Sequence, residues 1–392
     1  MAVSMCPFMF AHRTNWNLAE NRLTVALTKA RATRHRIADL TVSNPTSCGL
    51  NYDTATTLNA LTDVHAMLYS PDPKGLYSAR QSVVKYYAAL GVPIDLEQLF
   101  LNTGTSEAYS FIFRMLCNPG DELLIPTPSY PLFEFLADIH DIRLVRYPLL
   151  YDHGWQIDTN AFERGISSRT RGAVIVNPNN PTGNYANEDA IWLTRTCAQK
   201  EIALIADEVF FDYSLSPGPR YTFAAASEAL TFVLSGISKI CGLPQMKAAW
   251  TIVKGPQNLR KEAIGRLEVI ADTYLSMNAP VQYALPAFLE QRYEFQRQLS
   301  YRVRTNLAEL DRQLTFSKNC SRLKVEGGWN VVIRVPALRS DDDTAIELLE
   351  SKNVYVHPGH FYDFPGDGYL VVSLIVPIDE FADGIMKLLS IF

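Results

Sequence analysis

The feature that most constrains the fold is the alternation of short apolar runs with helix-like segments in the middle of the chain. Helical patterns cover 106–117 and 188–200. This alternation is typical of a mostly parallel sheet with helices on both faces. In such sheets, ligands bind at the carboxyl ends of the strands. Runs rich in β-branched and apolar residues predict strands at 122–126, 142–149, 172–177, 202–207, 231–235 and 249–253.

The last third of the chain predicts a second, smaller domain. A long, charged helical pattern covers about 281–310, and we expect Pro286 to interrupt or kink it. The pattern then changes to shorter strands at 323–335 and 368–376. A chain of 392 residues is long enough to form two cores. The expected α/β fold has a large domain at 46–285 and a smaller α+β domain formed by 1–45 together with 286–392.

Charge and composition exclude several classes of partner. The net charge is −5, from 36 basic and 41 acidic residues that are mixed along the chain, so we expect no nucleic-acid partner. No apolar stretch is long enough to span a bilayer, and the start has no basic residue before its apolar run, so we expect neither a membrane association nor a secretory signal. Six scattered cysteines predict reduced thiols in a cytoplasmic protein.

Histidine spacing gives no prediction of a metal site. His357 and His360 lie close together in VHPGH, but the Pro-Gly between them favours a turn. We therefore interpret them as two loop histidines and expect no bound metal.

The first of four strand-end loops, NTGTSEA at 102–108, is small, polar and opens a helix. The free N–H groups at a helix start suit a phosphate, with Thr105 and Ser106 as additional donors. The alternative is an ordinary helix start, in which Ser106 caps the helix and is followed by Glu107.

Two further loops place polar side chains at strand ends. VNPNNPTG (176–183) is made rigid by its Asn-Pro steps, which would hold the amide of Asn180 as a donor, although a simple loop explains the same pattern. Asp207 follows the apolar run IALIA directly. A carboxylate at the edge of a core usually has a cationic or donor partner, and a capping aspartate is the alternative.

The fourth loop, SGISKICGLPQMK (235–247), carries Lys239 after another apolar strand. A buried lysine is costly unless it is paired, deprotonated or covalently engaged. A lysine that points to solvent from a loop is the alternative. Each of the four loops is a modest signal, whereas their order along the chain is a specific one.

In that order the chain resembles the fold-type I pyridoxal-phosphate enzymes, and within them the class I/II aminotransferases. The resemblance runs from YSPDPKGLYSAR (69–80) through GGW (327–329) to the C-terminal strand. It implies pyridoxal 5'-phosphate as the cofactor. It further implies that Lys239 forms the Schiff base, that Asp207 keeps the pyridine nitrogen protonated, and that Asn180 holds the phenolic oxygen.

The resemblance also implies the remaining cofactor contacts. Tyr130 stands where the family has an aromatic residue stacked on the ring. Tyr69 matches a tyrosine that reaches the phosphate from the partner subunit, which implies a homodimer with shared sites. The implied phosphate-binding residues are Gly104, Thr105, Ser106 and either Ser238 or Ser235.

The chain departs from the family pattern at residues that matter for chemistry. Lys247 stands where an arginine usually holds the phosphate, and it offers a point charge without a bidentate fork. Phe210 replaces a tyrosine that donates to the phenolic oxygen, so we expect the pKa of the cofactor's imine to rise by about one unit or more, unless Tyr213 substitutes.

The third departure affects the substrate. In YLVVS (369–373), Val371 stands where the family has the arginine that binds the substrate's α-carboxylate. Either another basic residue supplies the charge or the amino donor has no carboxylate at that place. Asn44, in TVSNPT (41–46), is a candidate substrate contact, and a polar turn capped by Pro45 is an equal alternative.

The resemblance therefore predicts a dimeric transaminase that moves an amino group from a small-molecule donor to a keto or other carbonyl acceptor. Lys239 would move the proton at the substrate carbon. The loss of the arginine leaves a lyase, decarboxylase or oxidase on the same fold as the alternative. A non-enzymatic binding protein of this fold is disfavoured because Lys239, Asp207 and Asn180 are all present.

Overall fold

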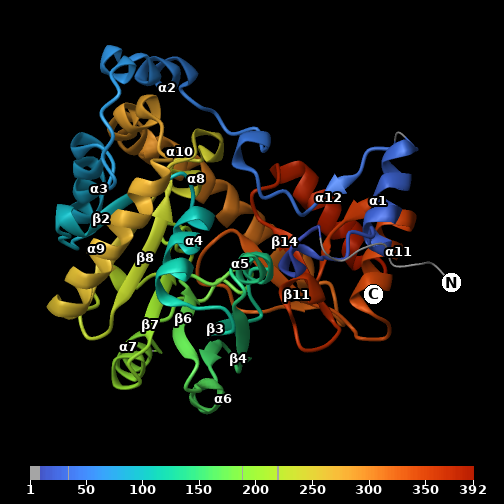
Figure 1. Cartoon of the computed structure of the whole chain (residues 1–392). Coiled ribbons are helices and arrows are strands. Elements are labelled where there is room, and N and C mark those ends of the chain that lie inside the picture. The colour runs from blue at the N-terminus through green and yellow to red at the C-terminus, as the bar shows by residue number, and fades with distance from the viewer. Residues whose placement is uncertain (1–8, 34, 188, 219) are drawn as a thin grey trace.

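The computed structural model describes residues 9–33, 35–187, 189–218 and 220–392 (Figure 1). Its largest sheet has the strand order β2-β9-β8-β7-β6-β3-β4-β5. The pairs from β8 through β7, β6 and β3 to β4 are parallel, whereas β9 is antiparallel to both β8 and β2. The strands are β2 (Leu99–Asn102), β3 (Glu122–Thr127), β4 (Arg143–Tyr151), β5 (Trp155–Ile157), β6 (Thr170–Val176), β7 (Ala203–Asp207), β8 (Thr231–Gly236) and β9 (Ala249–Lys254).

Helices cover both faces of this sheet because the strand residues alternate between two cores. On β6, for example, Val174 packs into one core and Ile175 into the other. One face is covered by α4 (Thr105–Leu116), α5 (Leu132–Ile139) and α9 (Gln257–Tyr274). The opposite face is covered by α3 (Tyr77–Ala89), α6 (Thr159–Gly165), α7 (Asp189–Gln199) and part of α10 (Ala279–Leu314).

The second region combines segments from both ends of the chain, as Figure 1 shows by its blue and red elements lying together. Its four-stranded sheet has the order β10-β11-β14-β13, and β1 pairs with β12 in parallel. The elements are α1 (Arg22–Ala32), β1 (Ala38–Asp39), β10 (Ser321–Arg322), β11 (Asn330–Arg334), α11 (Asp341–Lys352), β12 (Val354–Tyr355), β13 (His357–Pro358), β14 (Tyr369–Ser373) and α12 (Ile378–Leu389). A separate hydrophobic core joins the helices and strands of this region.

The remaining short elements connect these layers. They are α2 (Thr54–Asn59), α8 (Ile237–Ile240) and the 3₁₀ turns η1 (His12–Thr14), η2 (Pro45–Ser47), η3 (Ala60–Thr62), η4 (Val64–Met67), η5 (Leu96–Gln98), η6 (Phe223–Ala225), η7 (Pro244–Met246) and η8 (Gly359–Tyr362).

The fold confirms the predicted α/β architecture with a mostly parallel sheet, but Pro286 does not interrupt its longest helix. Helix α10 runs through Pro286 without a break. Leu285 and Phe288 on either side of the proline are fully buried, so core packing holds the helix together despite the lost hydrogen bond. The proposed division at 285/286 falls within α10.

Two observations bear on partners of other kinds. In the part of the chain that the structure describes, no helix is long and apolar enough to cross a membrane. Within the same residues, no group of three or more His, Cys, Asp or Glu side chains is placed to hold a metal ion.

Candidate active site

A cavity of about 420 Å³ lies between the carboxyl edge of the large sheet and the smaller sheet. The parallel strands β6, β7 and β8 all end at this edge, so the loops that follow them meet there. Asn180 follows β6, Asp207 ends β7 and Lys239 lies directly after β8, and all three line this one cavity.

Lys239 lies on the short helix α8, directly after β8. Its Nζ atom is 4.8 Å from the ring centre of Trp329 and 5.5 Å from that of Phe210. Burial against these rings disfavours the ammonium form and lowers the pKa of Lys239 to about 8, while the negative charge of Asp207 acts in the opposite direction. The amine is therefore a base that loses its proton close to neutral pH.

Asp207 ends β7 and is buried beneath the cavity. Tyr109 donates its hydroxyl to Oδ2 at 3.0 Å, and the backbone N–H of Val209 donates to Oδ1 at 3.1 Å. Burial raises the pKa of this carboxyl to about 6, although both hydrogen bonds and Lys239 lower it. A cationic group placed beside this buried carboxylate would therefore stabilise its charged form.

Asn180 is held in one orientation by a residue from the smaller sheet. The Nδ2 atom of Asn330, at the start of β11, donates to Oδ1 of Asn180 at 2.7 Å. The carbonyl end of the Asn180 amide is therefore occupied, and its NH₂ group is the end that remains to donate.

The loop at 102–108 forms the start of α4, as predicted. Gly104 is the N-cap residue, and no side chain caps the helix, so the alternative in which Ser106 acts as the cap does not hold. Glu107 accepts from the backbone N–H of Thr103 at 2.8 Å. Thr105 and Ser106 line the cavity.

The side chain of Lys247 also lies at the start of α4. A Cβ atom built on Gly104 would lie 3.4 Å from the Lys247 Nζ atom, so the two residues are immediate neighbours. The position of Lys247 follows from topology, because β9 is antiparallel and therefore begins at this edge of the sheet. The N–H groups of a helix start and an ammonium group together suit an anionic ligand.

The structure separates the two candidate serines of the phosphate site. Ser238 lines the cavity, whereas Ser235 is buried in β8 and donates to the backbone carbonyl of Glu208 at 3.4 Å. Tyr130 also lines the cavity and is 44 % exposed, which leaves its ring open to a ligand.

The structure does not bring Asn44 to the cavity. Its Oδ1 atom accepts from the backbone N–H and the hydroxyl of Thr46, at 3.1 and 2.8 Å, so the residue caps a turn before Pro45. Ser43 lines the cavity instead, together with Thr41. The polar-turn interpretation of Asn44 is the one that the structure supports.

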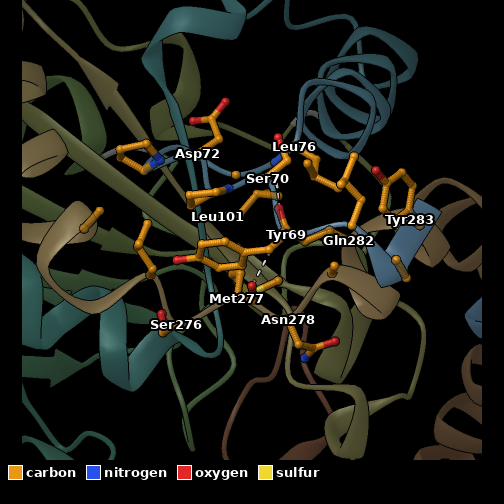
Figure 2. Close-up of a pocket in the computed structure, with 18 of the residues that line it drawn as sticks. Tyr69, Ser70, Asp72, Leu76, Leu101, Ser276, Met277, Asn278, Gln282 and Tyr283 are labelled. Atoms are coloured by element: carbon orange, nitrogen blue, oxygen red, sulfur yellow. Dashed lines mark hydrogen bonds between the residues drawn. The ribbon is translucent and has the colours of Figure 1, made fainter.

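Tyr69 also lies away from Lys239. Figure 2 shows it in a second pocket, of about 450 Å³, beside Met277 and Asn278. Its side chain is 81 % exposed, and the neighbouring Met67 and Leu68 are 90 % and 69 % exposed. Within one chain, therefore, Tyr69 makes no part of the cavity around Lys239.

Several residues that line the cavity were missed by sequence reasoning. Trp329 belongs to the GGW motif, but nothing in the sequence placed it against Lys239. His357 was expected in a loop, whereas it lies in β13 and pairs with Val371 of β14. Its Nδ1 atom is 3.0 Å from the hydroxyl of Tyr362, which also lines the cavity. Trp329, His357 and Tyr362 lie in the smaller sheet or next to its strands, and the position of that sheet over the cavity is a tertiary feature.

Fold and cavity together define an α/β enzyme of the aminotransferase type, and comparisons support that class. The sequence model of the family "Aminotransferase class I and II" matches residues 24–374. The chain belongs to this family, and it is an enzyme of the transferase class.

Similar proteins have related names. The chain is 25% identical over 358 residues to the glutamate-pyruvate aminotransferase AlaA of Escherichia coli K12, covering 88% of each chain. It is 27% identical over 356 residues to an alanine aminotransferase of Mycobacterium tuberculosis, covering 87% of this chain and 82% of that one. An alanine aminotransferase structure from Pyrococcus furiosus has a TM-score of 0.88 at 20% identity, covering 97% and 99% of the two chains.

Proposed function

We propose that this protein is an aminotransferase that binds pyridoxal 5'-phosphate through Lys239. The observation that carries the proposal is the meeting of Lys239, Asp207 and Asn180 in one cavity, next to the helix start at Gly104 and to Lys247. These groups come from distant parts of the sequence and match the chemical groups of the cofactor one by one.

The residues present fit that cofactor. Asp207 is a buried carboxylate with a raised pKa, and a protonated pyridine nitrogen beside it would relieve the cost of its burial. The open face of Tyr130 suits an aromatic ring, and the N–H groups of α4 with Lys247 suit a phosphate. Asn180 has a free amide donor for the phenolic oxygen.

When bound, pyridoxal phosphate supplies an electron sink for charge that develops on the substrate carbon. The chain supplies the proton transfer. With a pKa of about 8, the Lys239 amine takes the proton from the carbon that bears the donor's amino group. It then delivers this proton to the C4′ carbon of the cofactor. Asp207 and Asn180 orient the reacting group, and the indole of Trp329 covers Lys239 on its apolar side.

We infer that the substrates are a small-molecule amino donor and a keto or other carbonyl acceptor, used in two half-reactions. The similar proteins are named for alanine, for glutamate and pyruvate, and for tyrosine. Their names give no support to the alternative of a lyase, decarboxylase or oxidase.

We also propose a cytoplasmic homodimer in which Tyr69 enters the partner's cavity. The exposed apolar patch formed by Met67, Leu68 and Tyr69 supports this, because a contiguous exposed apolar surface usually marks an interface. The described cysteines are all free thiols, as a reducing compartment requires.

The proposal is tested by the absorption spectrum of the purified protein and of two variants. We expect a visible band in the wild type, its loss in Lys239→Ala, and its retention in Lys200→Ala, which removes an exposed lysine. Amino transfer to a panel of keto acids should disappear with the band. A Lys239→Ala variant that keeps both the band and the activity would contradict the proposal.

A further inference from the structure

The wall of the cavity at Val371 is apolar. Val371 is 1% exposed and pairs with Val332 on β11 and with His357 on β13. It belongs to a small hydrophobic cluster with Leu323, Val332, Tyr362 and Phe364. A substrate carboxylate at this wall would lose its water and contact aliphatic side chains.

No arginine lines the cavity among the residues that the structure describes. The arginine on the neighbouring strand, Arg334, reaches the Tyr369 hydroxyl, at 3.5 Å from Nη2, and is exposed. Two of the cationic side chains in the cavity have other partners in the proposed function. Lys239 holds the cofactor, and Lys247 lies at the helix start next to Gly104.

His357 is the remaining candidate for a positive charge. Burial lowers its pKa, and Asp39 is the charged group that acts in the opposite direction. Its Nδ1 atom is engaged with the Tyr362 hydroxyl, and its ring packs edge-on against Tyr355. The imidazole is therefore neutral near pH 7 and provides hydrogen bonds without a net charge.

The face around Tyr69 is the surface that a partner subunit would add in the proposed homodimer. The described residues that line the Tyr69 pocket include no lysine and no arginine. On the substrate side, the described residues that line the cavity thus offer neutral polar groups only. One of them, the indole N–H of Trp329, is buried and has no hydrogen-bond partner among the described residues.

We propose that the amino donor carries an uncharged polar group, such as a carboxamide or an ester, on the carbon that bears its amine. This group lies against Val371 and next to His357 and Tyr362, in the place where an α-amino acid would present a carboxylate. The inference rests on the proposed function. The reaction remains balanced, because the donor's C–NH₂ becomes C=O while the acceptor's C=O becomes C–NH₂, so no oxidant is required.

The test is equilibrium binding of a matched pair to the cofactor-loaded enzyme, 2-aminoisobutyrate and 2-aminoisobutyramide. Neither compound has a hydrogen on the carbon that bears its amine, so neither can donate its amino group by loss of a proton from that carbon. Dissociation constants come from absorbance titrations and are corrected to the concentration of neutral amine. We expect the amide to bind about tenfold tighter or more, because a carboxylate without a cationic partner is left poorly solvated.

Two variants sharpen the result. Val371→Arg should shift the ratio of the two constants by about tenfold or more in favour of the acid, whereas Val371→Leu, which adds no charge, should leave the ratio unchanged. Equal constants in the wild type, or tighter binding of the acid, would overturn the inference. The wild-type pair decides the question even if Val371→Arg fails to fold. A failure of the proposed function is a separate result, since it shows as a missing visible band.

Discussion

The Nζ atom of Lys239 lies 4.8 Å from the centre of the Trp329 ring, and this contact joins α8, directly after β8, to the start of the smaller sheet. The indole and Phe210 replace water around the amine, while Asp207 is the counter-charge. The lysine is consequently prepared to react as a neutral amine near physiological pH.

For Lys239 in the cofactor-free protein, we expect half-maximal reaction with an amine-selective reagent near pH 8, against 10.5 for an ordinary lysine. The sign follows from burial, which favours the neutral form. Mass spectrometry of the Lys239 peptide measures the labelling rate across pH 6–11. Asp207→Asn should lower this midpoint further, because it removes the charge that stabilises the ammonium. A midpoint near 10.5, the value of an ordinary lysine, would contradict the expectation.

For the substitution Asp207→Asn, we expect a loss of activity and a gain in the stability of the cofactor-free protein. The Asp207 pKa of about 6 in the folded state lies above the ordinary 3.8, so the native protein retains a proton that the unfolded chain releases between about pH 4 and 6. Stability from this group therefore falls as the pH rises through that window.

Asp207→Asn removes the cost of the buried charge and should raise the free energy of unfolding of the cofactor-free protein by about 1–3 kcal/mol at pH 8. The gain should disappear near pH 4, and the variant should lose cofactor binding. Urea unfolding at pH 4, 6 and 8 measures the difference. A gain that does not depend on pH would show that the carboxylate is not its source.

For Phe210, we expect a spectroscopic effect of its missing hydroxyl. The structure shows that Tyr213 does not substitute, because its hydroxyl donates to the backbone carbonyl of Lys239. Phe210→Tyr should lower the pKa read from the visible absorbance of the bound cofactor by about one unit or more. Tyr213→Phe is the matched control and should leave that pKa in place. If Tyr213→Phe changed this pKa and Phe210→Tyr did not, Tyr213 would be identified as the donor to the phenolic oxygen.

For Tyr69, we expect complementation between two inactive variants. Tyr69→Ala chains keep Lys239, and Lys239→Ala chains keep Tyr69, so a mixed dimer has one complete site if the sites are shared. An equal mixture after subunit exchange should recover about a quarter of the wild-type activity, since half of the dimers are mixed and each has one working site. No recovery, with mixed dimers verified by mass spectrometry, would place Tyr69 outside the partner's site.

Local sequence determined the parts of this protein that depend on one segment at a time. Apolar runs specified the buried strands, and the polar residues that follow them, Asn180, Asp207 and Lys239, could be recognised by their places at strand ends. Because parallel strands bring their carboxyl ends to one edge, these three residues were bound to meet once the sheet formed.

Only the tertiary structure decided what surrounds them. The region of the smaller sheet carries Trp329, His357 and Tyr362 to the cavity, and no pattern within their own segments indicates which side chains face it. Packing also overruled the helix-breaking tendency of Pro286. The place of Tyr69 was also decided by the tertiary structure, because this residue lies in a separate pocket of its own chain. A strand's periodicity is a local property, whereas the contact between two sheets depends on the complementary shape of whole surfaces, which only the folded chain possesses.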